Sequence, residues 1–389
     1  MSFDFDRVIA RDGTCSVKHD GSKAYFGTEN VLPLWVADMD FAAPEAVTRA
    51  LLDRAAHPVY GYSLYPESLF EALIAWIKKR HGWKVEREWI VMAQGVVPSL
   101  FASVLAFTEP GDGVIVQPPV YPPFFSAVTT NGRKLVENPL RLNNGRYSMD
   151  LDHLEQCVQN GARLLLLCSP HNPVGRVWSS TELEQVLRIA RRYDLTILSD
   201  EIHADLVYPG QQHMALAALA NDTDRLITAL APSKTFNIPG LGLSCLIVRN
   251  PEHRKALQKV FDSLHMGNMN PFSIAAFEAA YRAGEAWLDS LLIYLAGNRD
   301  FVADYLVTYL PGIHLVNSEG TYLLWLDCRK LNMSDAELRE FFVHEAHVGM
   351  NPGTTFGKGG DGFMRLNIAS PRSVILDALL RIEQALKAR

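Results

Sequence analysis

The sequence has no run of basic residues. Its 389 residues include 37 Lys and Arg against 43 Asp and Glu, which gives a formal net charge of −6. A surface that binds nucleic acid needs clustered Lys and Arg to neutralise the phosphates. We therefore expect no nucleic-acid partner, whereas a small anionic ligand needs only a few local groups and is compatible with this charge.

Cysteine is scarce, and no two cysteines form a CxxC pair. The five are scattered along the chain at Cys15, Cys157, Cys168, Cys245 and Cys328. Disulfide frameworks and many zinc sites need paired or regularly spaced cysteines. No cluster of His, Cys and Asp has the spacing of metal ligands either. These absences favour a reduced, cytoplasmic protein without a metal.

Long apolar runs are absent too, since none approaches the ~20 residues that a membrane-spanning helix needs. The first residues, MSFDFDRVIARDG, are polar and acidic, unlike a secretory signal or a transit peptide. Hydrophobic residues make up 48% and charged residues 21% of the chain, as in ordinary globular proteins. We expect no membrane partner and, from the length, two closely packed domains.

Four apolar runs predict buried strands, and helical patterns separate them. The run LTILSDE, for example, follows TELEQVLRIARRYD, whose apolar spacing is helical. Continuous apolar strands alternating with helices are typical of a mostly parallel α/β sheet covered on both faces. Two further helices are predicted at PEAVTRALLDRAA and PESLFEALIAWIKKRHG. The four strand runs are GVIVQPP (113–119), ARLLLLCSP (162–170), LTILSDE (195–201) and RLITALAPSK (225–234).

The two ends of the chain follow other patterns. Residues 1–44 look irregular, with LPLWVADMDFAAP (32–44) predicted as a short strand that enters a turn. From residue 275 a long helical stretch precedes the strand GTYLLWLDCR, a helix, the strand GFMRLNIA and a last helix that reaches Arg389. This order indicates an α+β region after the α/β region.

Polar residues stand where buried strands are predicted to end, which is where open parallel sheets bind ligands. Each such tip alone is weak evidence, because a lysine near a strand end is usually solvated and an aspartate there often caps a helix. Their joint occurrence on one fold pattern is more specific. The tips are AQGVVPS (93–99), QPPVYPPF (117–124), CSPHNPVG (168–175) with SDEIH (199–203), and APSK (231–234).

One chemistry uses all of these residue types. A partly desolvated lysine has a lowered pKa and can form a Schiff base with an aldehyde such as pyridoxal phosphate. That cofactor also needs N–H donors for its phosphate, a carboxylate for its ring nitrogen, a donor for its phenolic oxygen and an aromatic face. The candidates, in the same order, are Lys234, Gly95-Val96-Val97, Asp200, Asn172 and Tyr121.

Motifs along essentially the whole chain resemble fold-type I pyridoxal-phosphate enzymes of the class I/II aminotransferase superfamily. Within it, SDEIH together with SKTFNI resembles the MalY/PatB-type group of cystathionine β-lyases, which are C–S lyases. The motifs are WVADMDF (35–41), YGYS (60–63), PPVYPPF (118–124), CSPHNPVGRVW (168–178), SDEIHADL (199–206), SKTFNIPGL (233–241), GTYLLWLD (320–327) and MRLNIASPR (364–372).

The resemblance implies a fold and an assembly. The large cofactor domain would span residues 45–280, with a seven-stranded, mostly parallel sheet flanked by helices. A small α+β domain would combine residues 1–44 with residues 281–389. The group forms homodimers with active sites at the subunit boundary, so Tyr62 is expected to reach the partner's site, although it could instead pack beside Tyr60 and Tyr65.

It also implies residue roles. Lys234 would form the Schiff base and act as the general base, and Asp200 would pair with the ring nitrogen. Asn172 would bond the phenolic oxygen, and Tyr121 would stack on the ring. The phosphate would be held by Gly95, Val96, Val97 and Ser233. His203 stands where aminotransferases carry a tyrosine, so it is expected to be structural or a cofactor contact.

The substrate side is implied by the same resemblance. Arg365 would bind the α-carboxylate with its planar fork, beside Asn172 and Ala37. A surface ion pair is the alternative for Arg365, and its apolar neighbours in FMRLNI disfavour that alternative.

The implied reaction is α,β-elimination of L-cystathionine, or of a related cysteine S-conjugate, to a thiol, pyruvate and ammonia, as in methionine biosynthesis. Typical aminotransferases have an arginine where this chain has Gly242, a departure shared with the lyase group. The alternatives are a pyridoxal-phosphate aminotransferase and a regulatory protein that binds partners on the same fold. The second is disfavoured because a DNA-binding domain would have no room before residue 44.

Overall fold

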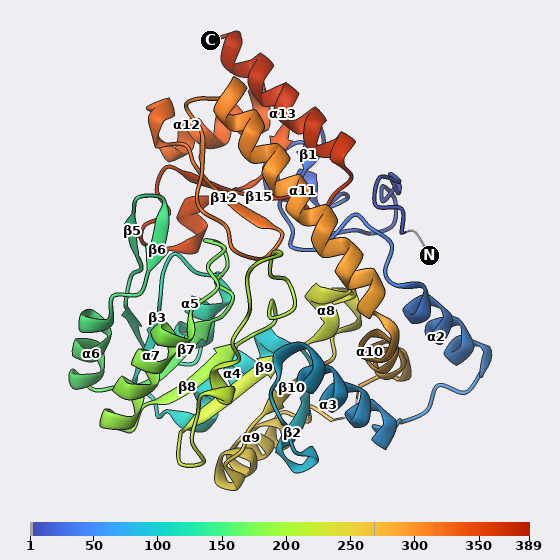
Figure 1. Ribbon diagram of the computed structural model, residues 1–389, viewed down its shortest axis with the longest axis vertical. Helices are drawn as coiled ribbons and strands as arrows, with labels where there is room; N and C mark the ends of the chain where they lie inside the picture. Colours follow the sequence, from blue (N-terminus) through green and yellow to red (C-terminus); the bar gives the residue numbers. More distant parts are fainter. Residues whose placement is uncertain (1–2, 268) are drawn as a thin grey trace.

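A seven-stranded sheet separates two groups of helices in the computed structural model, which describes residues 3–267 and 269–389 (Figure 1). Its strand order is β2-β10-β9-β8-β7-β3-β4, and only β10 runs antiparallel to its neighbours. The predicted α/β fold with a mostly parallel sheet is therefore confirmed. The strands are β2 (Ile90–Ala93), β10 (Ser244–Ile247), β9 (Leu226–Leu230), β8 (Thr196–Asp200), β7 (Ala162–Cys168), β3 (Gly113–Val116) and β4 (Lys134–Glu137).

The strands are apolar throughout because both faces of the sheet are buried. In β7, Leu164 and Leu166 belong to one hydrophobic core, whereas Leu165 and Leu167 belong to the other. The first core contains side chains of α4 (Val96–Phe107), α5 (Pro123–Thr129) and α9 (Pro251–Ser263). The second contains side chains of α3 (Glu67–His81), α6 (Leu151–Gln159), α7 (Ser180–Tyr193) and α10 (Pro271–Ala283).

A second, antiparallel sheet of four strands lies above the first in Figure 1, with two helices running across it. Its order is β11-β12-β15-β14, and the two helices are α11 (Glu285–Tyr309) and α13 (Arg372–Lys387). The N-terminal segment joins this region, because β1 pairs in parallel with β13. The strands are β11 (His314–Leu315), β12 (Leu323–Asp327), β15 (Phe363–Asn367), β14 (Asn351–Pro352), β1 (Leu32–Pro33) and β13 (Val348–Gly349).

Two predicted features are present with details that the sequence did not indicate. The short strand predicted within residues 32–44 is Leu32–Pro33, and after it side chains of Asn237 and Asn367 bind much of the backbone from residue 36 to 41. The long helical stretch from residue 275 is helical but is divided into α10 and α11 at Gly284. A Cβ atom at Gly284 would lie 2.3 Å from the ring of Phe236, so the close approach of that ring requires a glycine at the break.

The remaining elements are short, apart from α2. The helices predicted at residues 44–56 and 66–82 are confirmed as α2 (Glu45–Ala56) and α3. The division of the chain into residues 45–280 and residues 1–44 with 281–389 stays a prediction. None of the helices in the described residues has the length and apolar character needed to cross a bilayer. The short elements are α1 (Ser22–Phe26), α8 (Pro232–Thr235), α12 (Asp335–Glu340) and the hairpin β5 (Arg141–Asn143) and β6 (Arg146–Ser148).

Candidate active site

A cavity of about 330 Å³ lies at the carboxyl ends of β7, β8 and β9. The four predicted tips all contribute to its walls, although they are spread over more than 130 residues of sequence. Among the predicted site residues in the described part of the chain, only Arg365 and Tyr62 do not line it. The lining residues predicted from the sequence are Ala37, Gly95, Val96, Val97, Tyr121, Asn172, Asp200, His203, Ser233 and Lys234.

Lys234 lies on α8, directly after the buried strand β9. Its Nζ donates a hydrogen bond of 2.6 Å to the backbone oxygen of Ala37. Burial, and then the charge of Arg365, lower the pKa of Lys234 from 10.5 to about 8. Lys234, on the short helix that follows β9, therefore supplies an amine that is partly neutral near neutral pH, which is the form that attacks a carbonyl or accepts a proton.

Asp200 is the last residue of β8 and is buried, with 5% of its surface exposed. One carboxylate oxygen accepts a hydrogen bond of 3.1 Å from the backbone N–H of Ile202. Burial, with the charge of Glu201, raises the pKa of Asp200 from 3.8 to about 7. A cationic group in the cavity would keep this carboxylate ionised, since opposite charges favour each other's charged forms.

Another wall of the cavity is formed by the start of α4. Gly95 precedes the helix with a φ of 112°, a conformation that favours glycine, and Ser244 Oγ accepts its N–H at 3.1 Å. The first backbone N–H groups of a helix have no acceptor within it, and no described side chain caps those of α4. The N–H groups of Val96 and Val97 are thus available to an anion.

Gly242 also lines the cavity and has a φ of 61°, in the left-handed region. An arginine at this position, as in typical aminotransferases, would have to adopt a backbone conformation that side chains disfavour. The glycine therefore suits the backbone conformation of this loop. An anion in the cavity would have to be bound by backbone N–H groups and by the hydroxyl of Ser233.

Arg365 is in the middle of β15 and contacts Asn172, which lines the cavity. Its Nη1 donates to Asn172 Oδ1 at 3.1 Å, and its Nη2 donates to Trp35 O at 2.8 Å and to Asn351 Oδ1 at 2.6 Å. Burial lowers the pKa of Arg365 to about 10. Arg365 is 4% exposed and its hydrogen bonds in the described residues go to amide and backbone oxygens, so the surface ion pair considered for it is wrong.

Tyr121 and His203 line the cavity as predicted, from the loops that follow β3 and β8 respectively. Burial, together with the charges of Lys234 and Arg365, lowers the pKa of His203 to about 3, so the imidazole is neutral at physiological pH. Its Nδ1 is buried without a hydrogen-bond partner in the described residues, as is Arg365 Nε. Burial also raises the pKa of Tyr121, which therefore keeps its proton.

Sequence reasoning missed the contacts that position Ala37. The hydroxyl of Tyr322 donates to Ala37 O at 2.9 Å, so this oxygen accepts from Tyr322 and from Lys234 together. Tyr322 stands in the motif GTYLLWLD, but nothing local distinguishes it from the apolar strand that follows. Asp38, next to Ala37, was missed as well, although its charge raises the pKa of Lys234 against the effect of burial.

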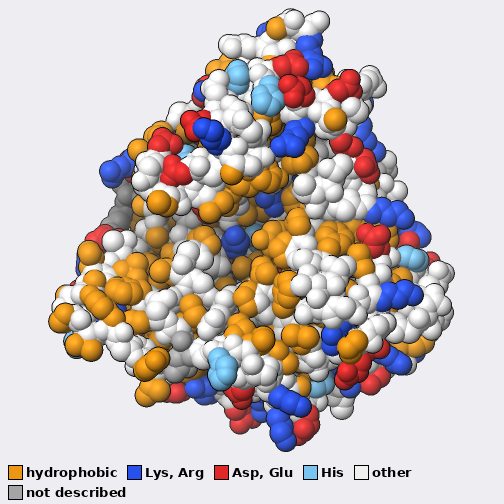
Figure 2. Space-filling model, turned by 180° about the vertical axis from the view of Figure 1, so that it is seen from behind, with side chains coloured by type: hydrophobic (Ala, Val, Ile, Leu, Met, Phe, Trp, Pro, Cys, Tyr) orange, Lys and Arg blue, Asp and Glu red, His pale blue; other side chains and the backbone are white. Residues whose placement is uncertain are grey.

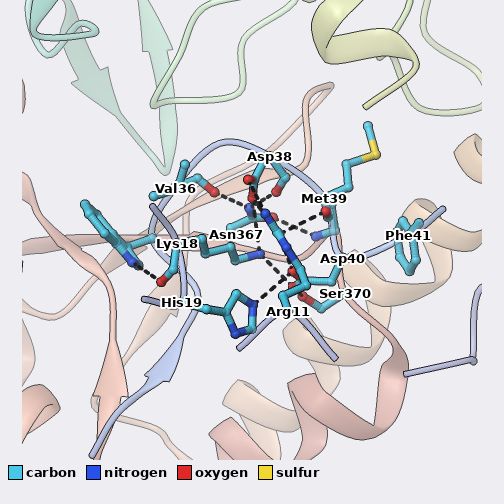
Figure 3. Close-up of polar contacts among 12 residues, drawn as sticks. Arg11, Lys18, His19, Val36, Asp38, Met39, Asp40, Phe41, Asn367 and Ser370 are labelled. Carbon is cyan, nitrogen blue, oxygen red and sulfur yellow. Dashed lines mark hydrogen bonds and ion pairs between the residues drawn. The ribbon is translucent and has the colours of Figure 1, made fainter. Parts of the chain in front are cut away.

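Figure 3 shows how residues 36–41 are held. Asn367 Nδ2 donates to Val36 O at 2.6 Å and to Asp38 O at 2.7 Å. Arg11 forms ion pairs of 2.7 Å with Asp38 and 2.8 Å with Asp40. From the loop that follows α8, Asn237 Nδ2 donates to Met39 O and to Phe41 O.

Asp40 is the centre of a second set of contacts in the same view. It pairs with the fully buried Lys18 at 2.6 Å and accepts a hydrogen bond from the hydroxyl of Ser370. The cluster ties the N-terminal residues to the end of β15 and to the loop after Lys234. The segment that carries Ala37 O is thereby fixed from three directions.

Comparisons with known proteins cover almost the whole chain. Residues 29–382 match the family described as aminotransferase class I and II. The chain is 42% identical over 384 residues to cystathionine beta-lyase PatB of Bacillus subtilis, covering 98% of this chain and 99% of that protein. It is 33% identical over 389 residues to protein MalY of Escherichia coli, covering 99% of each.

A solved structure gives the same relationship in three dimensions. The crystal structure of cystalysin from Treponema denticola, which contains a pyridoxal 5'-phosphate cofactor, superposes with a TM-score of 0.97 at 38% sequence identity. The superposition covers 100% of both chains.

Proposed function

This chain belongs to the aminotransferase class I and II family, and from that premise we propose that it is a pyridoxal-phosphate-dependent carbon–sulfur lyase. Its substrate would be L-cystathionine or a related cysteine S-conjugate. α,β-Elimination would release a thiol, which is homocysteine from cystathionine, together with pyruvate and ammonia. The observation that carries the proposal is one cavity that combines the amine of Lys234, with its lowered pKa, and the buried carboxylate of Asp200.

The residues of the cavity fit pyridoxal phosphate. Its volume of about 330 Å³ suits a small ligand, and two buried polar atoms at its edge, His203 Nδ1 and Arg365 Nε, lack partners among the described residues. The uncapped start of α4, with Ser233, would hold the phosphate. Asp200 would bind the ring nitrogen, Asn172 the phenolic oxygen, and Tyr121 a face of the ring.

The side chains can then perform the elimination. When bound, pyridoxal phosphate supplies an electron sink that stabilises negative charge at the substrate Cα. Lys234 removes the Cα proton, and its lowered pKa provides the neutral amine that this step needs. Asp200, as the carboxylate beside the ring nitrogen of the bound cofactor, would keep that nitrogen protonated. The Cβ–S bond breaks with both electrons leaving on sulfur, and hydrolysis of the released aminoacrylate gives pyruvate and ammonia.

A product analysis tests this proposal directly. Purified protein is incubated separately with cystathionine, with cysteine and with an amino acid that has no leaving group at Cβ, and thiol, pyruvate, ammonia and keto acid are measured. A lyase releases thiol, pyruvate and ammonia in equal amounts from cystathionine and does not turn over the third substrate. An aminotransferase, the alternative, gives a keto acid that retains the side chain and needs an acceptor keto acid.

Arg365 is proposed to bind the substrate carboxylate, and we expect Arg365→Lys to raise KM. Lysine offers a point charge in place of a planar fork, so one charge-assisted hydrogen bond is lost and kcat/KM should fall about 10- to 100-fold. Steady-state kinetics with cystathionine measure the effect. Arg176→Lys is the control, because Arg176 is equally buried but pairs with Glu182 and Glu319. A fall in kcat with unchanged KM for Arg365→Lys would exclude the carboxylate role.

The assembly is proposed to be a homodimer in which Tyr62 reaches the partner's site. Tyr62 is fully exposed, and its neighbours Val59, Tyr60 and Leu64 are exposed as well, on the extended segment between α2 and α3. Figure 2 shows hydrophobic side chains gathered around a hollow in one face, with Lys or Arg side chains visible inside it. Sedimentation should give a species of twice 43.4 kDa, and a monomer would refute the dimer.

The setting of the reaction follows from its products. Homocysteine is the direct precursor for methionine, so we propose a role in amino-acid metabolism and methionine biosynthesis in the cytoplasm.

A further inference from the structure

Two buried histidine–carboxylate pairs lie behind the candidate active site and have no part in the chemistry described so far. His81 Nε2 lies 3.0 Å from Asp205 Oδ1, and His213 Nε2 lies 2.8 Å from Glu201 Oε2. The two imidazole rings are 5.5 Å apart in an edge-to-face arrangement. All four side chains are at most 7% exposed, which makes the group unusual for charged residues.

Each pair is linked to one of the proposed catalytic residues, the first by a hydrogen bond to a chain neighbour of Lys234 and the second by the peptide bond between Glu201 and Asp200. Asp205 Oδ2 accepts a hydrogen bond of 3.0 Å from the hydroxyl of Thr235, the residue that follows Lys234. Glu201 directly follows Asp200. The indole N–H of Trp76 also donates to Asp205, at 3.1 Å and 3.2 Å from its two oxygens.

The contact between Asp205 and Thr235 bears on Lys234 because α8 is only four residues long. A helix of one turn has little stability of its own, so its direction depends on outside contacts. Trp76 and His81 are both on α3, and they hold Asp205 from that side. Through Asp205, Thr235 therefore links α8, the helix that carries Lys234, to the longer helix α3.

Asp205 binds these donors most strongly when it is ionised. Burial raises its pKa, but the hydrogen bond and charge of His81 and the donors Thr235 and Trp76 outweigh burial, so the net shift of the pKa is downward. A buried carboxylate with three donors directed at it is costly to move, because any displacement leaves one of these groups unpaired. Held by His81 and Trp76, the carboxylate in turn fixes where the hydroxyl of Thr235 must lie.

We propose that Asp205, held by His81, is a positioning residue for Lys234: it binds the hydroxyl of Thr235 and so aims the lysine amine into the cavity. The inference rests on the proposed function of Lys234 as the reactive amine. It adds that two contacts set the direction of this amine. One is its own hydrogen bond to Ala37 O, and the other is the hydrogen bond of Thr235 to the buried pair of Asp205 and His81.

Thr235→Val tests the inference, because valine has the shape of threonine without its hydroxyl. Thr235→Ser keeps the hydroxyl and should therefore behave like the wild type. Thr228→Val is the matched control, since Thr228 is fully buried in β9 and its hydroxyl has no partner in residues 3–267 and 269–389. The first readout needs no turnover: acylation of Lys234 in the cofactor-free protein, followed against pH by peptide mass spectrometry.

We expect the midpoint of acylation near pH 8 in the wild type, in Thr235→Ser and in Thr228→Val. In Thr235→Val it should rise by about 1 pH unit, because an amine that leaves its buried position regains solvent. The charged groups facing Lys234 are Arg365, Asp38 and Asp200, and these substitutions leave all three unchanged. In the loaded enzyme, kcat of Thr235→Val should fall about 10-fold with KM within about twofold.

The inference is overturned if Thr235→Val matches Thr228→Val in both acylation midpoint and kcat. If Thr235→Val does not fold, His81→Gln replaces it, with His253→Gln as the control because His253 is another buried histidine, on α9. His81→Gln must then raise the acylation midpoint, and an unchanged midpoint overturns the inference. If the midpoint depends on Thr235 but cystathionine is not cleaved, the positioning role stands and the proposed function fails.

Discussion

Replacing Lys234 by alanine is expected to abolish turnover while leaving a folded protein. Lys234 is the amine at the centre of the cavity, and burial, with the charge of Arg365, keeps its pKa near 8. Removal of the central nucleophile or base lowers kcat of other enzymes by about 10⁴- to 10⁶-fold, and we expect a loss in this range. Pyruvate release from cystathionine measures the loss, and the visible absorbance of the bound cofactor should disappear with it.

The control for this experiment is an exposed lysine. Lys84 forms an ion pair with Glu86 at the surface and is not among the residues that line the cavity, so Lys84→Ala should keep both activity and colour. Borohydride reduction of the wild type, followed by peptide mapping, should find the cofactor on the peptide that contains Lys234. Attachment to any other lysine would overturn the assignment, whatever the activity of Lys234→Ala.

Much of the site is predictable from sequence because its residues follow local patterns. Asp200 ends one apolar run of strand length and Lys234 follows another within four residues, and these runs are β8 and β9 in the structure. Parallel strands carry such residues to the same edge of a sheet, so their convergence on one cavity follows from the fold class. Arg365 is unusual in its sequence for a similar reason, since an arginine between apolar residues implies a buried partner.

The rest of the site depends on contacts between segments that are distant in sequence. The short strand predicted within residues 32–44 ends at Pro33, and the backbone that follows it is bound by Asn237 and Asn367 from other parts of the chain. No local signal in the sequence marks an asparagine as the partner of a segment about 200 or 330 residues away. For the same reason the sequence did not indicate that Ala37 O would accept hydrogen bonds from Lys234 and Tyr322 together.

The buried pairs behind the cavity show a further limit of sequence reasoning. His81 and Asp205 are 124 positions apart, and each looks ordinary where it stands, one at the end of a helix and the other after a strand motif. Their meeting depends on how α3 packs against the loop that follows β8. Sequence patterns therefore indicated the candidate catalytic residues, whereas the residues that hold them in place emerged only from the structure.

Asp200→Asn is expected to lower kcat about 100- to 1000-fold without unfolding the protein. The substitution keeps the volume of the side chain but removes the negative charge that would stabilise the protonated ring nitrogen. Losses of this size follow removal of one preorganised electrostatic partner in other active sites. Single-turnover measurement of Cα proton removal should show the same loss as kcat. Near-normal turnover in Asp200→Asn would remove the electron-sink role of this carboxylate.

The same substitution should have an effect on the stability of the cofactor-free protein that depends on pH. Burial raises the pKa of Asp200 from 3.8 to about 7, so between these values the folded protein holds a proton that the unfolded chain has lost. The free energy of unfolding of the wild type must therefore fall as pH rises through this window, and the raised pKa corresponds to about 4 kcal/mol.

Other carboxylates, such as Asp40 and Asp205, have lowered pKa values and act in the opposite direction, so the difference between wild type and Asp200→Asn is the useful quantity. We expect the variant to gain stability relative to the wild type from pH 4 to pH 7 and the difference to level off above that. Denaturant unfolding at several pH values measures it. A difference that does not change with pH would mean that Asp200 is ionised in the empty cavity, and the argument that it needs a cationic ring beside it would then fail.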